Sequence, residues 1–559
     1  MDAALEQQVR TWMALDPDAE TVAEAQALLA AGDEAGLHAR FDQRLAFGTA
    51  GLRGPLGAGP NRMNELVVRQ TAAGLADHVL AVNPNAATMG VVIGYDARHK
   101  SDRFAMATAQ VFADKGMRAY LFPHHVPTPV LAFAVLHLGV AVGVQVTASH
   151  NPPADNGYKV YWSDGPQIVP PMDEAIAAAI EAVAAAPTPV VLADEKHPLI
   201  SFVDQSVTNQ YLAGVAALDP HSSPASARAA LRIVYTPMHG VGGETIRTVL
   251  TAAGFTDLHM VTEQFAPDPD FPTVAFPNPE EPGALDLAIA TAKSVGAHII
   301  LANDPDADRM AAAIPDAGVP GGWRALRGDE IGWLLAEHRL ALVPGTAADR
   351  LLCTTIVSSS LLEAIAAKRG ATYVETLTGF KWLARAALAR PELVNVLSYE
   401  EALGYCVGSL VRDKDGISAA LVMADFAALV ASRGSTMVGE LGVIRETYGD
   451  YATEQWSLRF DGPTATADMA AFMDRLRADL PASIAGVAVT EVRDLATSQP
   501  PSDVIIMRLA DGGRIIVRPS GTEPKCKVYF ETVTRTGEPA PISVAAFKAD
   551  LAIRFNMPA

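Results

Sequence analysis

The chain has 559 residues, of which half are hydrophobic and 19% are charged. This balance is typical of a folded globular protein, and the length corresponds to about four domains. The 63 acidic and 43 basic side chains give a net charge of −20, which argues against nucleic acid and anionic membranes as main partners. Three scattered cysteines form neither a disulfide framework nor a zinc pattern, so a reducing, cytoplasmic setting is expected.

The N-terminal residues lack the basic and apolar regions of a secretory signal. The most apolar stretch, residues 130–148, contains His137, Gln145, Thr147 and two glycines. We interpret it as a buried helix and strand, because a membrane span needs a longer uninterrupted apolar run. The sequence therefore predicts no membrane partner.

Helix and strand patterns alternate along most of the chain. Ala-rich amphipathic segments end at a glycine and are followed by a short apolar strand, with helices expected at residues 101–115, 243–253, 284–295 and 358–369. Glycine is the usual residue just after a helix, and this alternation predicts repeated α/β units. The last hundred residues differ, because a hairpin and a third strand are expected at residues 504–509, 514–517 and 527–530.

Ser149 follows the apolar run 140–146 and is surrounded by residues that favour turns, in the sequence Thr-Ala-Ser-His-Asn-Pro. A hydroxyl at the end of a strand is placed for chemistry, and we expect it on an exposed loop. The alternative is a serine that only caps a turn.

A second polar cluster follows the apolar run 297–302 and contains Asp304, Asp306 and Asp308. Three carboxylates so close together repel one another, so a fold that gathers them usually holds a hard cation between them. An EF-hand calcium loop is excluded, because it needs glycine and glutamate where this chain has Arg309 and Pro315. A solvated acidic turn remains the alternative.

Two further clusters lie toward the C-terminus. Arg518 to Lys525, with the sequence Arg-Pro-Ser-Gly-Thr-Glu-Pro-Lys, offers a guanidinium, hydroxyls and exposed backbone, which together suit a phosphate monoester. Glu400, in Tyr-Glu-Glu-Ala-Leu-Gly, could accept hydrogen bonds from sugar hydroxyls or cap a helix. The segment 240–243 lacks the third glycine of a dinucleotide-binding loop, and the chain contains no Walker P-loop.

Taken together, these four clusters resemble the α-D-phosphohexomutase superfamily in kind and in order, over nearly the whole chain. The segments 47–54, 276–281 and 378–382 look most similar to its phosphoglucomutase and phosphopentomutase branch. The resemblance implies three α/β domains with mixed sheets and an α+β C-terminal domain around a central cleft. It places an N-terminal helical extension at 1–40 and the four domains at 41–205, 206–322, 323–445 and 446–559.

The resemblance also implies a phosphosugar mutase. Ser149 would carry the phosphoryl group, and Mg²⁺ would be held by Ser149, Asp304, Asp306 and Asp308, with glucose 1,6-bisphosphate or a similar sugar bisphosphate as activator. The catalytic residues implied are Ser149, His150, Lys159 and Lys414. The substrate-binding residues implied are Arg53, Arg309, Thr378, Gly379, Lys381, Glu400, Arg412, Arg518, Ser520, Gly521 and Thr522. Structural and functional roles are equally open for Asp96, Arg98 and His239.

One position departs from the hexose-specific pattern. Ala402 stands where those enzymes carry a second hydroxyl-bearing serine, so pentose phosphates become plausible substrates. The resemblance favours a phosphoglucomutase, and a phosphopentomutase, a phosphomannomutase and a sugar-bisphosphate synthase are the alternatives. A non-catalytic sugar-phosphate-binding protein would not need Ser149 or the aspartates. A monomer or dimer is expected.

Overall fold

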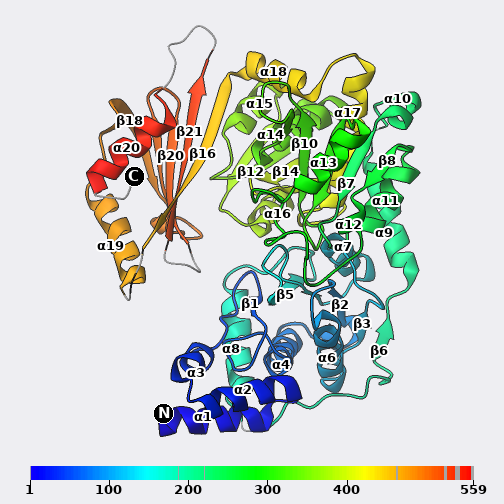
Figure 1. Ribbon diagram of the computed structural model, residues 1–559, viewed down its shortest axis with the longest axis vertical. Coiled ribbons are helices and arrows are strands. Elements are labelled where there is room, and N and C mark those ends of the chain that lie inside the picture. The colour runs from blue at the N-terminus through cyan, green and yellow to red at the C-terminus, as the bar shows by residue number, and fades with distance from the viewer. Residues whose placement is uncertain are drawn as a thin grey trace.

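The computed structural model describes residues 2–186, 188–219, 221–460, 462, 464–520, 525–535 and 542–555 (Figure 1). The described chain is built around four sheets, and we call the parts around them domains I to IV in chain order. The first three sheets mix parallel and antiparallel strands and are covered by helices, whereas the fourth is antiparallel throughout. The expected class, three α/β domains and an α+β C-terminal domain, is confirmed.

Three short helices precede domain I and lie at its lower edge in Figure 1. They are α1 (Ala3–Leu15), α2 (Ala19–Ala31) and α3 (Glu34–Phe41). Each begins after an aspartate whose carboxylate accepts a backbone N–H of the first turn, which is the usual way to satisfy a helix start. Their apolar faces form a small core around Trp12 and Phe41, to which Ala58 and Leu66 of domain I also contribute.

Domain I has a six-stranded sheet in the order β1-β5-β4-β2-β3-β6. Its strands are β1 (Leu52–Pro55), β2 (Val91–Tyr95), β3 (Ala119–Leu121), β4 (Val142–Val146), β5 (Asp155–Trp162) and β6 (Ile200–Phe202). Its helices are α4 (Glu65–Val82), α5 (Ala86–Met89), α6 (Ser101–Asp114), α7 (Thr128–Leu138) and α8 (Met172–Ala184). The neighbours β2 and β4 run parallel, so the loops after both strands meet at one edge of the sheet.

Domain II repeats this plan with five strands in the order β11-β10-β9-β7-β8. Its strands are β7 (Ile233–Thr236), β8 (Leu258–Met260), β9 (Ile299–Asn303), β10 (Met310–Pro315) and β11 (Trp323–Ala325). Its helices are α9 (Gln205–Leu218), α10 (Ala225–Ala230), α11 (Gly243–Ala252), α12 (Thr262–Phe265) and α13 (Asp286–Val295). The antiparallel pair β9 and β10 is joined by the loop that carries the three aspartates.

Domain III has four strands in the order β13-β12-β14-β15. They are β12 (Arg350–Thr355), β13 (Thr372–Thr376), β14 (Val394–Glu400) and β15 (Gly404–Val407). Its helices are α14 (Gly328–Leu342), the 3₁₀ turn η1 (Ala347–Asp349), α15 (Leu361–Arg369), α16 (Phe380–Leu388), α17 (Gly416–Ser432) and α18 (Met437–Tyr448). Helix α15 begins three residues later than expected, and the N–H of Ser359, just before it, donates to the Asp329 side chain.

Domain IV is the antiparallel sheet at the upper left of Figure 1, in the order β16-β21-β20-β19-β18-β17. Its strands are β16 (Asp450–Arg459), β17 (Ser483–Ile484), β18 (Val487–Asp494), β19 (Ile505–Leu509), β20 (Arg514–Pro519) and β21 (Lys525–Thr534). Its helices are α19 (Ala465–Ala478), the 3₁₀ turn η2 (Leu495–Thr497) and α20 (Val544–Phe555). The expected hairpin and third strand are confirmed as β19, β20 and β21.

The hydrophobic cores show which domains form one body. One continuous core joins helix α7 of domain I with both sheets of domains II and III, and the almost entirely buried helix α17 is part of it. Domain I has a second core around β4 and β5. Domain IV has a core of its own, although Tyr451 and Val533 join the continuous core. Its contact with domain III includes an apolar cluster and a polar network in which Arg514 donates to the carbonyl of Ile356 at 3.2 Å and, within domain IV, to Glu531 at 3.0 Å.

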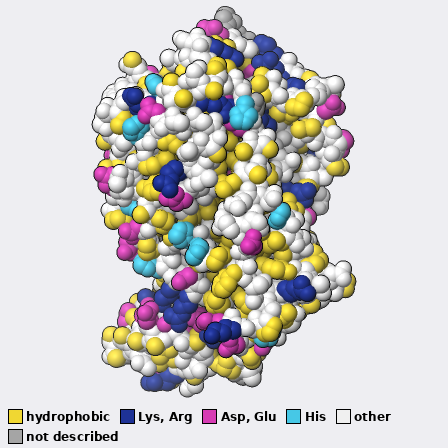
Figure 2. Space-filling model, turned by 90° about the vertical axis from the view of Figure 1, so that its right-hand side faces the viewer, with side chains coloured by type: hydrophobic (Ala, Val, Ile, Leu, Met, Phe, Trp, Pro, Cys, Tyr) yellow, Lys and Arg dark blue, Asp and Glu magenta, His cyan; other side chains and the backbone are white. Residues whose placement is uncertain are grey.

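Within the described residues, no single helix has the length and apolar composition needed to cross a membrane. The apolar stretch 130–148 folds as α7 and β4, as expected. On the face shown in Figure 2, side chains of Lys and Arg are interspersed with those of Asp and Glu.

Candidate active site

The serine loop of domain I and the aspartate loop of domain II meet at the centre of the molecule. Ser149 lies between β4 and β5, and its Oγ donates a hydrogen bond of 2.8 Å to Asp304 Oδ2. The side chain is not on an exposed loop, since Ser149 is only 3% accessible. That expectation was wrong because the aspartate loop packs directly over the serine loop, a contact between domains that local sequence does not reveal.

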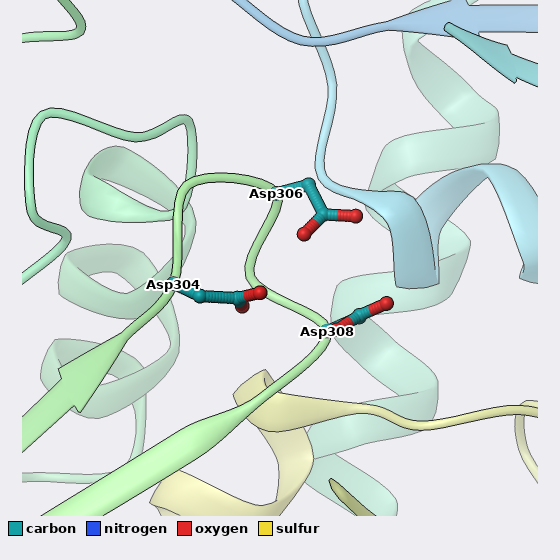
Figure 3. Close-up of side chains that lie close together, drawn as sticks. All are labelled: Asp304, Asp306 and Asp308. Atoms are coloured by element: carbon teal, nitrogen blue, oxygen red, sulfur yellow. The ribbon is translucent and has the colours of Figure 1, made fainter. Parts of the chain in front are cut away.

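The three aspartates form one buried cluster. Their carboxylate oxygens lie within 4.8 Å of one another, and Figure 3 shows them on a single turn between β9 and β10. Burial, reinforced by Asp306 and Asp308, raises the pKa of Asp304 well above its ordinary value. Oδ1 of both Asp306 and Asp308 is buried without a hydrogen-bond partner. Unpaired carboxylate oxygens at this spacing are the donor set of a hard cation.

Two lysines offset the negative charge of this cluster. Lys159 Nζ, from β5, lies 2.6 Å from Asp306 Oδ2 and 2.8 Å from Asp308 Oδ2, and Lys414 Nζ lies 3.5 Å from Asp308. Burial alone would lower the pKa of Lys159, but the two carboxylates outweigh burial and raise it. Lys414 is fixed because the next residue, Asp415, caps helix α17 through the N–H groups of Ile417 and Ser418.

The glycine-rich segment 240–243 shapes the aspartate loop. The N–H of Val241 donates to the carbonyl of Pro305 at 2.8 Å, and a Cβ on Gly240 would lie 2.3 Å from the Cα of Pro305. Glycine is therefore required at position 240 so that the two loops can pack closely. This explains the glycine in a segment that lacks the dinucleotide-binding pattern.

Two arginines and a histidine surround the serine. His150 Nδ1 lies 3.2 Å from Ser149 Oγ, and burial together with nearby Arg309 and Arg53 lowers the pKa of His150 well below its ordinary value. Arg309 donates to the carbonyl of Ala402 at 3.0 Å, and Arg53 donates to the side chain of Asn151 at 3.1 Å. Arg309 thus connects the aspartate loop with the predicted sugar loop of domain III.

The predicted sugar-binding residues of domain III come from two loops that lie together. The N–H of Gly379 donates to Glu400 Oε1 at 2.8 Å, so the segment 378–381 and the glutamate share one wall. Lys381 donates to the hydroxyl of Thr49 in domain I, and burial lowers the pKa of Lys381 to about 8. Arg412 reaches domain I as well, donating to the carbonyl of Asp164 at 2.6 Å.

Domain IV supplies the predicted phosphate loop. Arg518 is near the end of β20, opposite Lys527 on β21, and the N–H of Ser520 donates to the carbonyl of Lys525 at 2.7 Å. Gly521 and Thr522 lie outside the described residues. The half-buried Lys527 was not predicted; burial lowers its pKa, and Glu401 of domain III partly offsets this shift. Tyr529 of the same strand lines a pocket together with Glu401, so this strand faces the sugar loop.

Sequence reasoning missed one direct partner of the aspartates and left another undecided. Thr128, the first residue of α7, donates to Asp306 Oδ2 at 2.5 Å, and nothing in its local sequence marks it. Asp96 and Arg98 were left open between structural and functional roles, and both contact the serine loop. The available signal was that both residues directly follow β2. Because β2 runs parallel to β4, the residues after these two strands meet.

Models of one protein family match the chain in four consecutive parts. The descriptions are phosphoglucomutase/phosphomannomutase, alpha/beta/alpha domain I at residues 44–186, domain II at 209–318 and domain III at 327–441, and the C-terminal domain at 477–537. The four matches together cover more than half of the chain, and they follow the order of the four sheets.

Curated relatives match almost end to end but carry different names. A probable phosphoribomutase of Schizosaccharomyces pombe is 40% identical, over 95% of this chain and 94% of its own. A probable phosphomannomutase of Haemophilus influenzae is 41% identical, over 84% and 93%. A mouse glucose 1,6-bisphosphate synthase is 34% identical, over 96% and 91%.

A solved structure of a phosphoglucomutase/phosphomannomutase family protein from Burkholderia thailandensis shares the fold. Its TM-score is 0.70 at 20% identity, with 92% of this chain and 97% of that chain covered. The fold, the four family matches and the full-length relatives agree with the resemblance seen in the sequence. The chain therefore belongs to the phosphoglucomutase/phosphomannomutase family of the α-D-phosphohexomutase superfamily and is an isomerase that acts as an intramolecular phosphotransferase.

Proposed function

We propose that this enzyme moves a phosphoryl group between C1 and the terminal carbon of a sugar phosphate, through a phosphoserine at Ser149 and a sugar bisphosphate. The observation that carries this proposal is the pairing of Ser149 Oγ with Asp304, 2.8 Å apart, inside a buried cluster of three carboxylates and two lysines. A hydroxyl in such a place has no evident structural need, whereas a group that accepts and returns a phosphoryl group must lie among charges that balance the transferring phosphate.

Mg²⁺ is the cation that we propose for the aspartate cluster. The unpaired oxygens of Asp306 and Asp308 are hard donors, and Ser149 Oγ adjoins the third carboxylate. When bound, the ion polarises the phosphoryl group and offsets its negative charge. Asp304, Asp306 and Asp308, with one oxygen of phosphorylated Ser149, would hold it.

The remaining residues suit the two ends of the substrate. Arg309 and Arg53 lie next to the serine loop and would contact the transferring phosphate. Proton transfer to and from the sugar hydroxyl needs a basic side chain within reach, and Lys159, Lys414 and His150 lie around Ser149 and its aspartate partners. Across the cleft, Glu400 and the segment 378–381 would bind the sugar, and the loop after Arg518 would bind the other phosphate, with glucose 1,6-bisphosphate or a similar compound priming the serine.

For the substrate, we propose a mutase that accepts pentose phosphates as well as hexose phosphates. Ala402 supplies a carbonyl to Arg309 but no hydroxyl to the sugar, which removes a hydrogen bond that would favour hexoses. Relatives of nearly equal identity are named for ribose and for mannose phosphates. This supports a site that is not specialised for either a pentose or a hexose. Glucose phosphate, favoured from the sequence resemblance, remains in the proposed range.

The test is a coupled assay that compares the 1-phosphates of glucose, mannose, ribose and deoxyribose, primed with a sugar bisphosphate. We expect turnover of at least one pentose and one hexose phosphate. Ser149→Ala should keep the fold but lose turnover, to less than about 10⁻³ of the wild-type rate, as when other covalent nucleophiles are removed. Intact mass after priming should show one phosphate on the wild type and none on this variant; substantial activity of Ser149→Ala would refute the phosphoserine.

A second candidate is a synthase of sugar bisphosphates, which one full-length relative is named for. It would use the same serine and the same carboxylates but release the bisphosphate. Chromatography of the products distinguishes the two, because a synthase accumulates bisphosphate without isomerised monophosphate.

A further inference from the structure

Arg98 lies beneath the serine loop as a consequence of the sheet topology. Strand β2 ends at Tyr95, which pairs with Val146 at the end of β4. The residues that follow both strands therefore emerge side by side at one edge of the sheet. The side chain of Arg98 is 1% exposed, and it extends under the loop that contains Ser149.

The guanidinium of Arg98 binds the backbone of this loop at four points. Its Nη2 donates to the carbonyls of Ser149 at 2.8 Å and of Asn151 at 2.5 Å. Its Nη1 donates to the carbonyls of Pro152 at 2.7 Å and of Asp155 at 3.0 Å. A rigid planar fork that satisfies four carbonyls at once fixes the path of the loop between them.

Asp96 secures the same loop from its other end. One carboxylate oxygen accepts from the N–H of Arg98 at 3.0 Å and the hydroxyl of Ser101 at 2.8 Å. The other accepts from Thr147 Oγ1 at 2.6 Å, and Thr147 Oγ1 in turn accepts from the N–H of Ser149 at 2.9 Å. The nucleophile is thus held both before and after its own position.

This attachment matters because Ser149 has a φ of +54°. Residues with a Cβ avoid the left-handed region and stay there only where the surroundings impose it. In this conformation Ser149 Oγ faces Asp304. A serine free to relax to an ordinary conformation would turn its hydroxyl away from the aspartate cluster.

We propose that Arg98 is a positioning residue that holds Ser149 in its left-handed conformation, so that the hydroxyl faces the aspartate cluster. It acts through the loop carbonyls and contacts no reacting atom. The inference rests on the proposed role of Ser149. It predicts that loss of the guanidinium slows phosphorylation of the serine while leaving sugar-phosphate binding to domains III and IV intact.

The test compares Arg98→Met and Arg98→Lys with a matched control. Arg350 is the control, because its guanidinium also donates to three backbone carbonyls, those of Leu340, Val343 and Gly345, far from the serine. The first readout is the rate at which glucose 1,6-bisphosphate phosphorylates the serine, followed by intact mass. The second is the KM for a sugar 1-phosphate, and the third is hydrogen exchange of the amides at 147–157.

We expect Arg98→Met to phosphorylate about a hundred times more slowly, since a displacement of about 1 Å can have that effect. Its KM should stay within about threefold, and exchange should accelerate in the serine loop alone. Arg98→Lys should have an intermediate phosphorylation rate, because it keeps the charge but not the planar fork. If Arg98→Met does not fold, the comparison of Arg98→Lys with the wild type serves as the test. Arg350→Met should lose thermal stability but keep the phosphorylation rate.

Wild-type phosphorylation rates in both Arg98 variants would overturn the proposal, and so would unchanged exchange at 147–157. Full recovery in Arg98→Lys would also overturn it, because charge alone would then explain the effect. The proposed function is tested separately. Turnover by Ser149→Ala would overturn the role of the serine, whereas an inactive Ser149→Ala beside fully active Arg98 variants would overturn only the role of Arg98.

Discussion

The two halves of the predicted site are built differently. On the side of the serine, the central residues are buried and contact one another; they are Ser149, Lys159, Asp304, Asp306 and Asp308. On the side assigned to sugar and phosphate binding, the side chains keep part of their surface accessible, as seen for Thr378, Lys381, Glu400, Arg518 and Ser520. The first half is assembled before any substrate arrives, whereas the second retains surface for substrate to cover.

The largest effect should follow from a change in the assembled half. Asp306→Asn removes one charge from the cluster and weakens its hold on a cation, so turnover should fall by about 10²-fold or more, as expected when several kcal/mol of metal-based stabilisation are lost. Chelation of the wild type should have the same effect, reversed by added Mg²⁺. Asp286→Asn, an exposed carboxylate at the start of α13, is the control. Unchanged activity of Asp306→Asn would mean that the cluster is a structural turn.

A change in the accessible half should alter affinity more than rate. Arg518→Lys replaces a fork that can bind two phosphate oxygens with a point charge, and a charge-assisted hydrogen bond is worth about 1.5 to 3 kcal/mol. We expect the KM for sugar phosphates to rise at least about tenfold. Arg508→Lys, on the neighbouring strand β19, should leave KM unchanged. Equal affinity in both variants would place the phosphate site elsewhere.

Glu401 follows Glu400 in the sugar loop and lines a pocket together with Tyr529 of domain IV. Burial, together with Glu400 and Asp329, raises the pKa of Glu401 from 4.5 to about 7. A carboxyl with a raised pKa contributes its stability fully below the unfolded pKa and loses it as pH rises through 7. Glu401→Gln should therefore gain about 1 to 3 kcal/mol in free energy of unfolding relative to wild type between pH 5.5 and 8.5.

Chemical denaturation at both pH values measures this difference. Glu446→Gln, an exposed position on α18, is the control and should show no such pH dependence. If the free energy of unfolding changes with pH equally in the two variants, Glu401 is not a buried, protonated carboxyl. Its surroundings would then contain more water than the structure indicates.

The smallest effect concerns sugar choice. Ala402→Ser leaves the carbonyl that accepts from Arg309 and adds a hydroxyl in the sugar loop. One hydrogen bond is worth about 0.5 to 1.5 kcal/mol, so the ratio of kcat/KM for hexose over pentose phosphates should rise about two- to tenfold. An unchanged ratio, or one that shifts toward pentose, would assign sugar choice to Thr378 or to loop geometry.

The sequence was informative wherever a local pattern determines structure. Helix α6 and the hairpin of β19 and β20 follow from periodicity and turn residues, and the order of the polar clusters revealed the family. The burial of Ser149 and the contact of Thr128 with Asp306 could not be foreseen, because both depend on how domains I and II pack. Likewise, Arg98 comes close to the four carbonyls that it binds only once β2 and β4 pair in register.

The division of the hydrophobic cores has a consequence for cooperativity. The serine and aspartate loops are flanked by strands of domains I and II, whereas Arg518 is near the end of β20, whose residues Ile515 and Val517 belong to the core of domain IV. Domain IV contacts domain III through an apolar cluster, through Tyr451 and Val533, which join the continuous core, and through hydrogen bonds such as that from Arg514 to the carbonyl of Ile356. Because most of domain IV packs around a core of its own, we expect the local stability around Arg518 to differ from that of the serine and aspartate loops.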